Sequence, residues 1–564
     1  MSDAAPIDAR PMLNAYPDSM GGRLADIVDL VARPDLAGAF GSFYILPSLF
    51  NTDLDRGFSV IDYGLNEMYA SQADLDAIRS LGLDLKLDFV VNHLSVLSKE
   101  FQDVVRNGEG SAYRDFFVDW NRFWDGRGEM TDGGYIQPRP ELIEDMFFRK
   151  PGLPILMVRF PDGRDVPYWN TFYQEVRFGR LDVQDLMAAL DIQYGSANEL
   201  ADVVNRALDA GTPPEEIPLG RLERFREGVL ELLASRRRYM GQMDVNIGSP
   251  LVWEYYDRTL RTLAAYGARI VRLDAFAYAP KSPGKRNFLN DPETWDLLKG
   301  VRELADRYGV TLLPEIHASY RERTHERIAA EGYLTYDFFL PGLVLDALER
   351  RSGEDLARWA RDVRDKGLRT VTMLGCHDGI PLLDLDGLVP QERITGLIET
   401  VVARGGHVKS LHGQRALYYQ VNATYFSALG EDERSMLLAR AIHLFMPGKP
   451  QVWYLDLFAG RNDHEAVRNA GQGGHKEINR TNLTAADVAA RLEETVVRDQ
   501  LTLLRFRNTS AAFGFDAALE VAHTPEGRLS LRWEKDGVVA LLDADLSTRS
   551  FTVTDGTGTV VFAQ

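Results

Sequence analysis

The chain has 564 residues, of which 45% are hydrophobic and 26% charged, so it is long enough for one large core with satellite modules. Its 64 Lys and Arg against 83 Asp and Glu give a net charge of −19, which disfavours nucleic acid and anionic membrane surfaces as partners. The single cysteine, Cys376, excludes a disulfide framework. The N-terminal segment lacks an apolar signal region and no run of about 18 apolar residues occurs, so we expect a cytoplasmic protein.

Short apolar runs alternate along the chain with segments of helical periodicity. This alternation predicts an α/β fold with a parallel sheet covered on both faces. Over this length it favours a (β/α)8 TIM barrel over a doubly wound sheet, since no Gly-x-Gly-x-x-Gly turn follows any of the strands. The predicted strands span residues 39–49, 85–92, 268–274, 311–315, 334–339, 370–375 and 451–454.

Three segments interrupt the alternation and predict additional subdomains. Residues 93–242, after the third barrel strand, are too long for a loop and should form an inserted B-type subdomain; within them, residues 173–241 are a long insertion. Residues 381–427 should form a second inserted loop subdomain, after the seventh strand. Residues 513–564 alternate apolar and polar positions and should form a C-terminal antiparallel β domain. The barrel itself would then consist of residues 1–92, 243–380 and 428–512.

Polar clusters follow four of the predicted strands. Catalytic residues of barrel enzymes collect at the carboxyl ends of the strands, and an ionisable group at the end of a buried strand needs partners or a use. One such cluster alone could be a strand that reaches solvent with a stray charge, but four in succession predict one active site. The clusters are Asp88-Phe-Val-Val-Asn92-His93, Arg272-Leu-Asp274-Ala, Leu313-Pro-Glu315-Ile-His317 and Cys376-His377-Asp378.

In this order and spacing the clusters resemble the four signature regions of glycoside hydrolase family 13, the α-amylase superfamily. The resemblance extends from Pro17-Asp18-Ser19 to Asn479-Arg480 and is strongest to the sucrose phosphorylase-like branch. Further runs that resemble this branch are Asp55-Arg-Gly-Phe-x-x-x-Asp62-Tyr63, Pro151-Gly-Leu-Pro154, Gly387-Leu-Val-Pro390, Gln420-Val-Asn-x-Thr-Tyr425 and Ile478-Asn-Arg480.

The resemblance implies a retaining enzyme with three catalytic carboxyl groups. Asp274 matches the nucleophile, and Arg272, two residues earlier on the same strand face, is expected to keep it ionised and to bind the sugar. Glu315 matches the general acid/base, which should have a raised pKa because of apolar cover and the nearby Asp274 charge. Asp378 matches the carboxylate that binds sugar hydroxyls more tightly in the transition state.

Other residues match substrate-binding positions of the branch. His93 and His377 resemble histidines that bind glucose hydroxyls, and Asp62 with Arg480 should form a charge pair on the far side of the ring. For Phe172 and Gln242 packing in the core is an alternative. The full set of substrate-binding candidates is Asp62, His93, Phe172, Gln242, Arg272, Tyr278, His317, His377, Tyr419, Gln420 and Arg480.

The resemblance implies no cofactor and no metal, although Asn92 matches a calcium-binding position of many amylases.

Phosphate handling in sucrose phosphorylases involves an Arg before Pro-Gly-Leu-Pro and a Tyr before Gln-Val-Asn; here these positions hold Lys150, beside Arg149, and Tyr419. Lys can still carry charge to phosphate, though without the planar fork of Arg. Leu417 stands where sucrose phosphorylases carry an Asp that contacts fructose, so the acceptor could differ from fructose.

We therefore expect an enzyme of carbohydrate metabolism, a glycosyltransferase-type phosphorylase that uses inorganic phosphate and sucrose or a related small α-glucoside and releases α-glucose 1-phosphate. The alternatives are an α-glucosidase, a sucrose hydrolase or a transglucosidase of the same fold, and, more remotely, a non-catalytic carbohydrate-binding protein. Relatives in the branch include dimers, which leaves a homodimer open. The acceptor, whether fructose, glycerol, glycerate or another, is left open by the sequence.

Overall fold

The computed structural model describes residues 6–411, 417–471 and 474–564. The chain divides into two compact units. The first comprises Met1–His93, Pro138–Leu153 and Val245–Gln564, and the second comprises Leu94–Gln137 and Pro154–Asp244. Residues 138–153, inside the segment 93–242 that we expected to be one insertion, thus group with the first unit.

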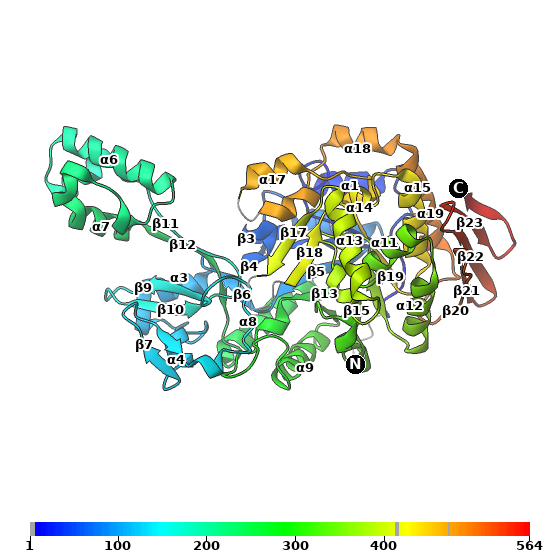
Figure 1. Cartoon of the computed structure of the whole chain (residues 1–564), viewed down its shortest axis with the longest axis horizontal. Coiled ribbons are helices and arrows are strands. Elements are labelled where there is room, and N and C mark those ends of the chain that lie inside the picture. The colour runs from blue at the N-terminus through cyan, green and yellow to red at the C-terminus, as the bar shows by residue number, and fades with distance from the viewer. Residues whose placement is uncertain (1–5, 412–416, 472–473) are drawn as a thin grey trace. The chain divides into compact units, whose positions relative to one another are not determined.

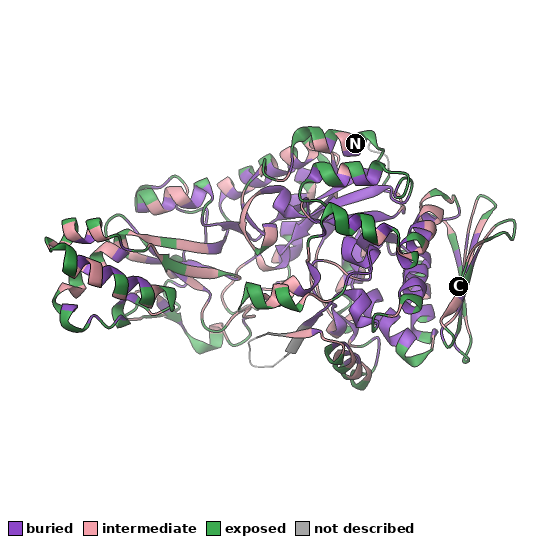
Figure 2. Ribbon diagram, turned by 90° about the horizontal axis from the view of Figure 1, so that it is seen from above, coloured by how far each residue is buried: buried purple, intermediate pink, exposed green. Residues whose placement is uncertain are grey.

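The first unit is built on eight parallel strands, which confirms the predicted (β/α)8 barrel (Figure 1). The strands follow one another around the sheet in chain order, with the seam between the fifth and the sixth. Almost all of their residues are buried, as the purple ribbons of Figure 2 show. The strands are β1 (Met12–Ala15), β2 (Ser42–Ile45), β5 (Asp84–Val90), β13 (Ala268–Asp274), β14 (Thr311–Pro314), β15 (Thr335–Asp337), β16 (Thr370–Thr372) and β19 (Lys449–Trp453).

Helices connect these strands and pack on the outside of the barrel. The ends of α2 show why they form where they do: Ser71 and Asp74 make a capping box at its start, and Gly82, at φ +75°, turns the chain after its end. The principal helices are α1 (Leu24–Ala32), α2 (Gln72–Ser80), α8 (Pro250–Ala265), α9 (Glu293–Asp306), α10 (Thr324–Ala330), α11 (Leu340–Arg350), α12 (Glu354–Asp365), α13 (Gln391–Ala403), α15 (Glu433–Phe445), α18 (Ala485–Leu492) and α19 (Thr495–Thr509).

Strand register determines which side chains enter the barrel. On β5, Phe89 packs outward against Tyr256 of α8, with ring centroids 5.2 Å apart. Side chains alternate along a strand, so Lys86 and Asp88 of β5 point inward. The register pairs Asp88 with Arg272 on β13, which places both residues on the same face of the sheet at the same height.

Smaller sheets add to the barrel in the first unit. The predicted C-terminal β region forms a five-stranded antiparallel sheet: β20 (Ala518–His523), β21 (Arg528–Lys535), β22 (Val538–Asp545), β23 (Ser550–Asp555) and β24 (Val560–Ala563). Trp533 anchors it, since its indole N–H donates to the Phe445 carbonyl at 2.8 Å. After β16 the chain forms a hairpin of β17 (His407–Leu411) and β18 (Leu417–Asn422).

The second unit contains a helical lobe with its own apolar core. Strands β11 (Gln174–Phe178) and β12 (Arg237–Asp244) form an antiparallel ribbon, and α5 (Val183–Leu190), α6 (Tyr194–Asp209) and α7 (Arg226–Ser235) lie between them in the chain. Eleven buried hydrophobic residues, among them Leu186, Leu200, Val204 and Leu233, make up the core of this lobe. The lobe therefore buries its hydrophobic face within itself.

Across the described ranges 6–411, 417–471 and 474–564, every helix is too short or too polar to cross a membrane.

Candidate active site

The catalytic residues predicted from the sequence meet at the carboxyl ends of β13 and β14. Asp274 is the last residue of β13, and Glu315 directly follows β14. The Arg272 guanidinium contacts both carboxyl groups, at 3.0 Å from Asp274 and 2.7 Å from Glu315, and also forms an ion pair with Asp88. Since Arg272 is only 3% exposed, one buried cation links the two carboxyl groups that the chemistry requires.

Asp378 lies in the loop after β16, beside His377 and two cations. Its carboxylate is 2.7 Å from Lys476 Nζ, 3.2 Å from His377 Nε2 and 3.7 Å from Arg480 Nη2. Burial by itself would raise the pKa of Asp378, but Lys476, His377 and Arg480 outweigh it and lower the pKa well below its ordinary value. Asp378 is therefore an anion at neutral pH.

Phe58 joins the two halves of this site. Its ring stacks on His377, with centroids 4.9 Å apart, and the Arg272 guanidinium lies 5.4 Å from its centre. The Phe58 carbonyl lies 2.9 Å from Nε2 of His93. Two of the predicted sugar-binding histidines thus contact Phe58, His377 through the ring and His93 through the carbonyl oxygen.

The pKa values of the two carboxyl groups correct our expectation. Burial raises the pKa of Asp274 well above its ordinary value, the charge of Glu315 adds to this, and Arg272 only partly opposes it. For Glu315, burial is outweighed by Arg272 and by His317, so its pKa lies below the ordinary value. Of the two carboxyl groups the proton therefore favours Asp274, which is the reverse of the protonation that the predicted roles need.

His317, predicted to bind substrate, lies between two carboxylates. Its ring is 3.6 Å from Glu315 and 3.1 Å from Asp384, and it stacks on Phe338 with centroids 3.9 Å apart. Burial would lower the pKa of His317, but hydrogen bonds to Asp384 and Glu315 raise it to about 9. His317 is therefore a cation at neutral pH and holds Glu315 in place.

Replacement of His317 should change the pH dependence of stability. The ordinary His pKa is 6.5 and the folded value is about 9, so the stabilisation is complete below pH 6.5 and is lost as pH rises through 9. The shift corresponds to a free energy on the order of 3 kcal/mol. Urea unfolding should show the difference between wild type and His317→Gln shrinking by roughly this amount from pH 6 to pH 10; a constant difference would contradict a charged His317.

Other predicted residues lie around this centre. The Tyr278 hydroxyl accepts from Arg149 Nη1 at 3.4 Å, and Gln420 Oε1 accepts from the Gly379 amide at 3.3 Å. Lys150 is half-buried next to Arg149. Asn92 Oδ1 accepts from Lys281 Nζ at 3.1 Å. Among the residues the structure describes, no group of three or more His, Cys, Asp or Glu is arranged to hold a metal ion.

Three predicted residues are not placed at this site by the structure. Phe172 and Gln242 belong to the second unit, where the Gln242 side chain accepts from the Tyr173 amide at 3.2 Å. The side chain of Tyr419 lies outside the described residues, as does that of Leu417. Their roles stay predictions.

The predicted pairing of Asp62 with Arg480 is wrong. Arg480 lies 3.6 Å from Asp55 and 3.7 Å from Asp378. Asp62 is exposed and accepts from Asn51 at 2.8 Å, because the irregular register of β3 (Phe50–Leu54) and β4 (Ser59–Leu65) places these two residues opposite each other. The charge partners of Arg480 thus include Asp378 and Asp55, the first residue of the Asp55-Arg-Gly-Phe run, rather than Asp62.

Lys476 is the main site residue that the sequence analysis missed. It lies in a short 3-10 helix (Gly474–Asn479), four residues before Arg480, and both residues contact Asp378. Its position four residues before Arg480, which the sequence analysis had identified, was the signal that could have pointed to it.

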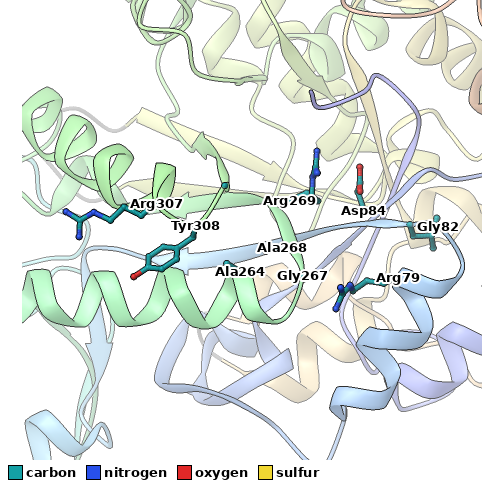
Figure 3. A pocket seen from close by; sticks show the side chains of 11 residues that line it. Arg79, Gly82, Asp84, Ala264, Gly267, Ala268, Arg269, Arg307 and Tyr308 are labelled. Carbon is teal, nitrogen blue, oxygen red and sulfur yellow. The ribbon is translucent and has the colours of Figure 1, made fainter. Parts of the chain in front are cut away.

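A cavity of about 640 Å³ lies at the opposite, amino-terminal end of β5 and β13 (Figure 3). Its lining includes Arg79, Asp84, Arg269 and Arg307, and Figure 3 shows the three arginines spread in different directions rather than directed at one point. Because barrel active sites form at the carboxyl ends of strands, this cavity is not the active site.

Comparisons with known proteins agree with the site. No family model matches the chain. A sucrose 6(F)-phosphate phosphorylase of Ilumatobacter coccineus is 49% identical over 98% of this chain and 96% of its own length. A sucrose phosphorylase of Streptococcus mutans is 30% identical over 99% of this chain and 100% of its own length. The crystal structure of a sucrose 6F-phosphate phosphorylase from Thermoanaerobacter thermosaccharolyticum matches with a TM-score of 0.80 and 30% identity, over 100% of this chain and 98% of that one. The chain is therefore an enzyme of the sucrose phosphorylase-like branch of glycoside hydrolase family 13.

Proposed function

We propose that the protein catalyses reversible phosphorolysis of sucrose 6F-phosphate, or of a related small α-glucoside, through a covalent glucosyl-enzyme. The observation that carries the proposal is that one buried Arg272 guanidinium contacts both Asp274 and Glu315. Retaining glycoside transfer needs two carboxyl groups about 5–5.5 Å apart, one as nucleophile and one as acid/base. Two carboxyl groups that contact one guanidinium lie close to each other, which supports this pair of roles.

The reaction proceeds in two displacements. An Asp274 oxygen attacks the anomeric carbon while Glu315 gives its proton to the leaving oxygen, so that an ester bond forms as the glycosidic bond breaks. A phosphate oxygen then attacks the same carbon, the ester breaks, and Glu315 accepts the phosphate proton. Asp378, held ionised by Lys476 and His377, stabilises the positive charge that develops on the sugar in both steps.

Substrate binding must transfer the proton from Asp274 to Glu315. Arg272 and His317 keep Glu315 ionised in the free site. A glucoside that seats its leaving oxygen against Glu315 would weaken the Arg272 contact and exclude water, which favours the protonated acid. Arg272 would then pair mainly with Asp274 and Asp88, which returns Asp274 to the anion that attacks.

A phosphorylated acceptor is supported by two features. The 49% identical relative is a sucrose 6(F)-phosphate phosphorylase, whereas at 30% identity the relatives include both a sucrose 6F-phosphate phosphorylase and a sucrose phosphorylase. Leu417 also removes the carboxylate that sucrose phosphorylases place near fructose, and that carboxylate would repel a phosphate group on the fructose.

The test is an assay of glucose 1-phosphate released from sucrose 6F-phosphate, sucrose, glucosylglycerol and glucosylglycerate, with and without inorganic phosphate. We expect phosphate-dependent release, with the highest kcat/KM for sucrose 6F-phosphate. Equal release of free glucose with and without phosphate would contradict phosphorolysis. A higher kcat/KM for sucrose or for a glycerol or glycerate glucoside would contradict the proposed acceptor while leaving the reaction type intact.

A further inference from the structure

A lysine lies inside the barrel, below the level of the paired residues Asp88 and Arg272. Lys86 is two residues before Asp88 on β5, faces the interior, and is 0% exposed. Its Nζ donates to Tyr336 on β15 and, at 2.6 Å, to Gln451 on β19, and lies 3.8 Å from the centre of the Tyr44 ring on β2. Lys86 therefore contacts side chains from three other barrel strands.

A short series of contacts leads from Lys86 to the catalytic carboxyl groups. The Tyr44 hydroxyl donates to Asp88 Oδ2 at 2.8 Å, and Asp88 Oδ1 forms an ion pair with Arg272. Arg272 in turn contacts Asp274 and Glu315. The orientation of Arg272, and with it the spacing of the two carboxyl groups, thus depends on a side chain that Lys86 packs against.

Burial of an amine costs free energy of desolvation, so the presence of Lys86 inside the barrel needs an explanation. Desolvation disfavours the charged form, and burial lowers the pKa of Lys86 well below its ordinary value. An apolar residue of similar length would fill the same volume without this cost. An amine, however, can donate to Tyr336 on β15 and Gln451 on β19 at once, and thereby links β5 to strands on the far side of the barrel.

We propose that Lys86 is a positioning residue of this enzyme: anchored by Tyr336 and Gln451, it holds Tyr44 so that Asp88 and Arg272 keep Asp274 and Glu315 at the separation that glucosyl transfer needs. The inference rests on the proposed function, because it assigns catalysis to these two carboxyl groups. Lys86 acts on them through Tyr44, Asp88 and Arg272.

The test is Lys86→Met, which keeps the length of the side chain and removes the donor. We expect kcat for phosphorolysis to fall about 10- to 100-fold with KM changed less than threefold, since small displacements of reacting groups cost about this much. Lys449→Met is the matched control: Lys449 is 1% exposed on β19, and its Nζ bonds Asp8 and the Arg10 carbonyl at the start of the strand. The control should lose thermal stability and keep kcat.

A double-mutant cycle with Tyr44→Phe separates positioning from general loss of stability. If Lys86 acts through Tyr44, the kcat of the double variant should be close to that of the worse single variant. Multiplied effects on kcat, or an unchanged kcat in a Lys86→Met protein that is only less stable, would overturn the inference. Asp274→Asn run beside them tests the proposed function separately, because an active Asp274→Asn enzyme would refute that function whatever Lys86 does.

Discussion

Asp274→Asn should lower kcat for phosphorolysis by about 10⁴-fold or more, because it removes the nucleophile and leaves an amide that cannot form the glucosyl ester. The protein should still fold. Burial already raises the pKa of Asp274, so a neutral amide of the same shape suits the site, and Arg272 retains Asp88 and Glu315 as partners. Steady-state release of glucose 1-phosphate, with thermal unfolding measured alongside, checks both statements.

Asp337→Asn is a matched control for this variant. Asp337 is also buried at the end of a barrel strand, and burial raises its pKa to about 6. Its carboxylate accepts from the Trp359 indole at 2.9 Å and from the Leu340 amide at 3.0 Å, away from Arg272. The control should alter stability and leave kcat within a few fold. Turnover by Asp274→Asn comparable to that of the control would refute the nucleophile assignment.

Glu315→Gln should lower kcat with a sucrose-type substrate by roughly 10³- to 10⁴-fold, since the leaving oxygen loses its proton donor. With α-glucosyl fluoride the formation of the glucosyl-enzyme should fall far less, because fluoride departs without a proton. Single-turnover experiments compare the two substrates, and the reaction of the fluoride serves as the control for that of the sucrose-type substrate. Equal losses with both would mean that Glu315 does not act as the acid.

Azide distinguishes the two carboxyl groups by stereochemistry. In Glu315→Ala, azide takes the place of phosphate after the glucosyl-enzyme has formed, so the product should be α-glucosyl azide. In Asp274→Ala, azide occupies the space of the missing nucleophile and attacks once, so any product should be the β-azide. NMR of the anomeric proton tells the two apart, and exchanged outcomes would reverse the assignments.

The sequence predicted the barrel because seven of its strands lie in short apolar runs, four of which are followed by polar clusters. It missed β1 (Met12–Ala15) because Asn14, which is polar yet buried, interrupts the apolar run. Its neighbours β2 and β19, which pair with it on either side, determine its conformation.

Within the site, the chemical role of a residue could be predicted more readily than the residues that it contacts. Asp274, Glu315 and Asp378 stand in short motifs, so their residue types point to their chemistry. The pairing of Arg480 with Asp55 depends on the bulged register of the β3–β4 ribbon, which no local pattern reveals. The lowered pKa of Glu315 likewise arises from Arg272 and His317 together, and the distances to both come only from the fold.

The helical lobe of the second unit begins and ends at one pair of facing residues in the β11–β12 ribbon. Phe178 of β11 lies opposite Arg237 of β12, so the two ends of segment 179–236 are one strand spacing apart, about 4.8 Å. A tight two-residue hairpin could close the same ribbon. Segment 179–236 can therefore be lengthened, shortened or exchanged, in evolution or by design, without a change in the register of the strands.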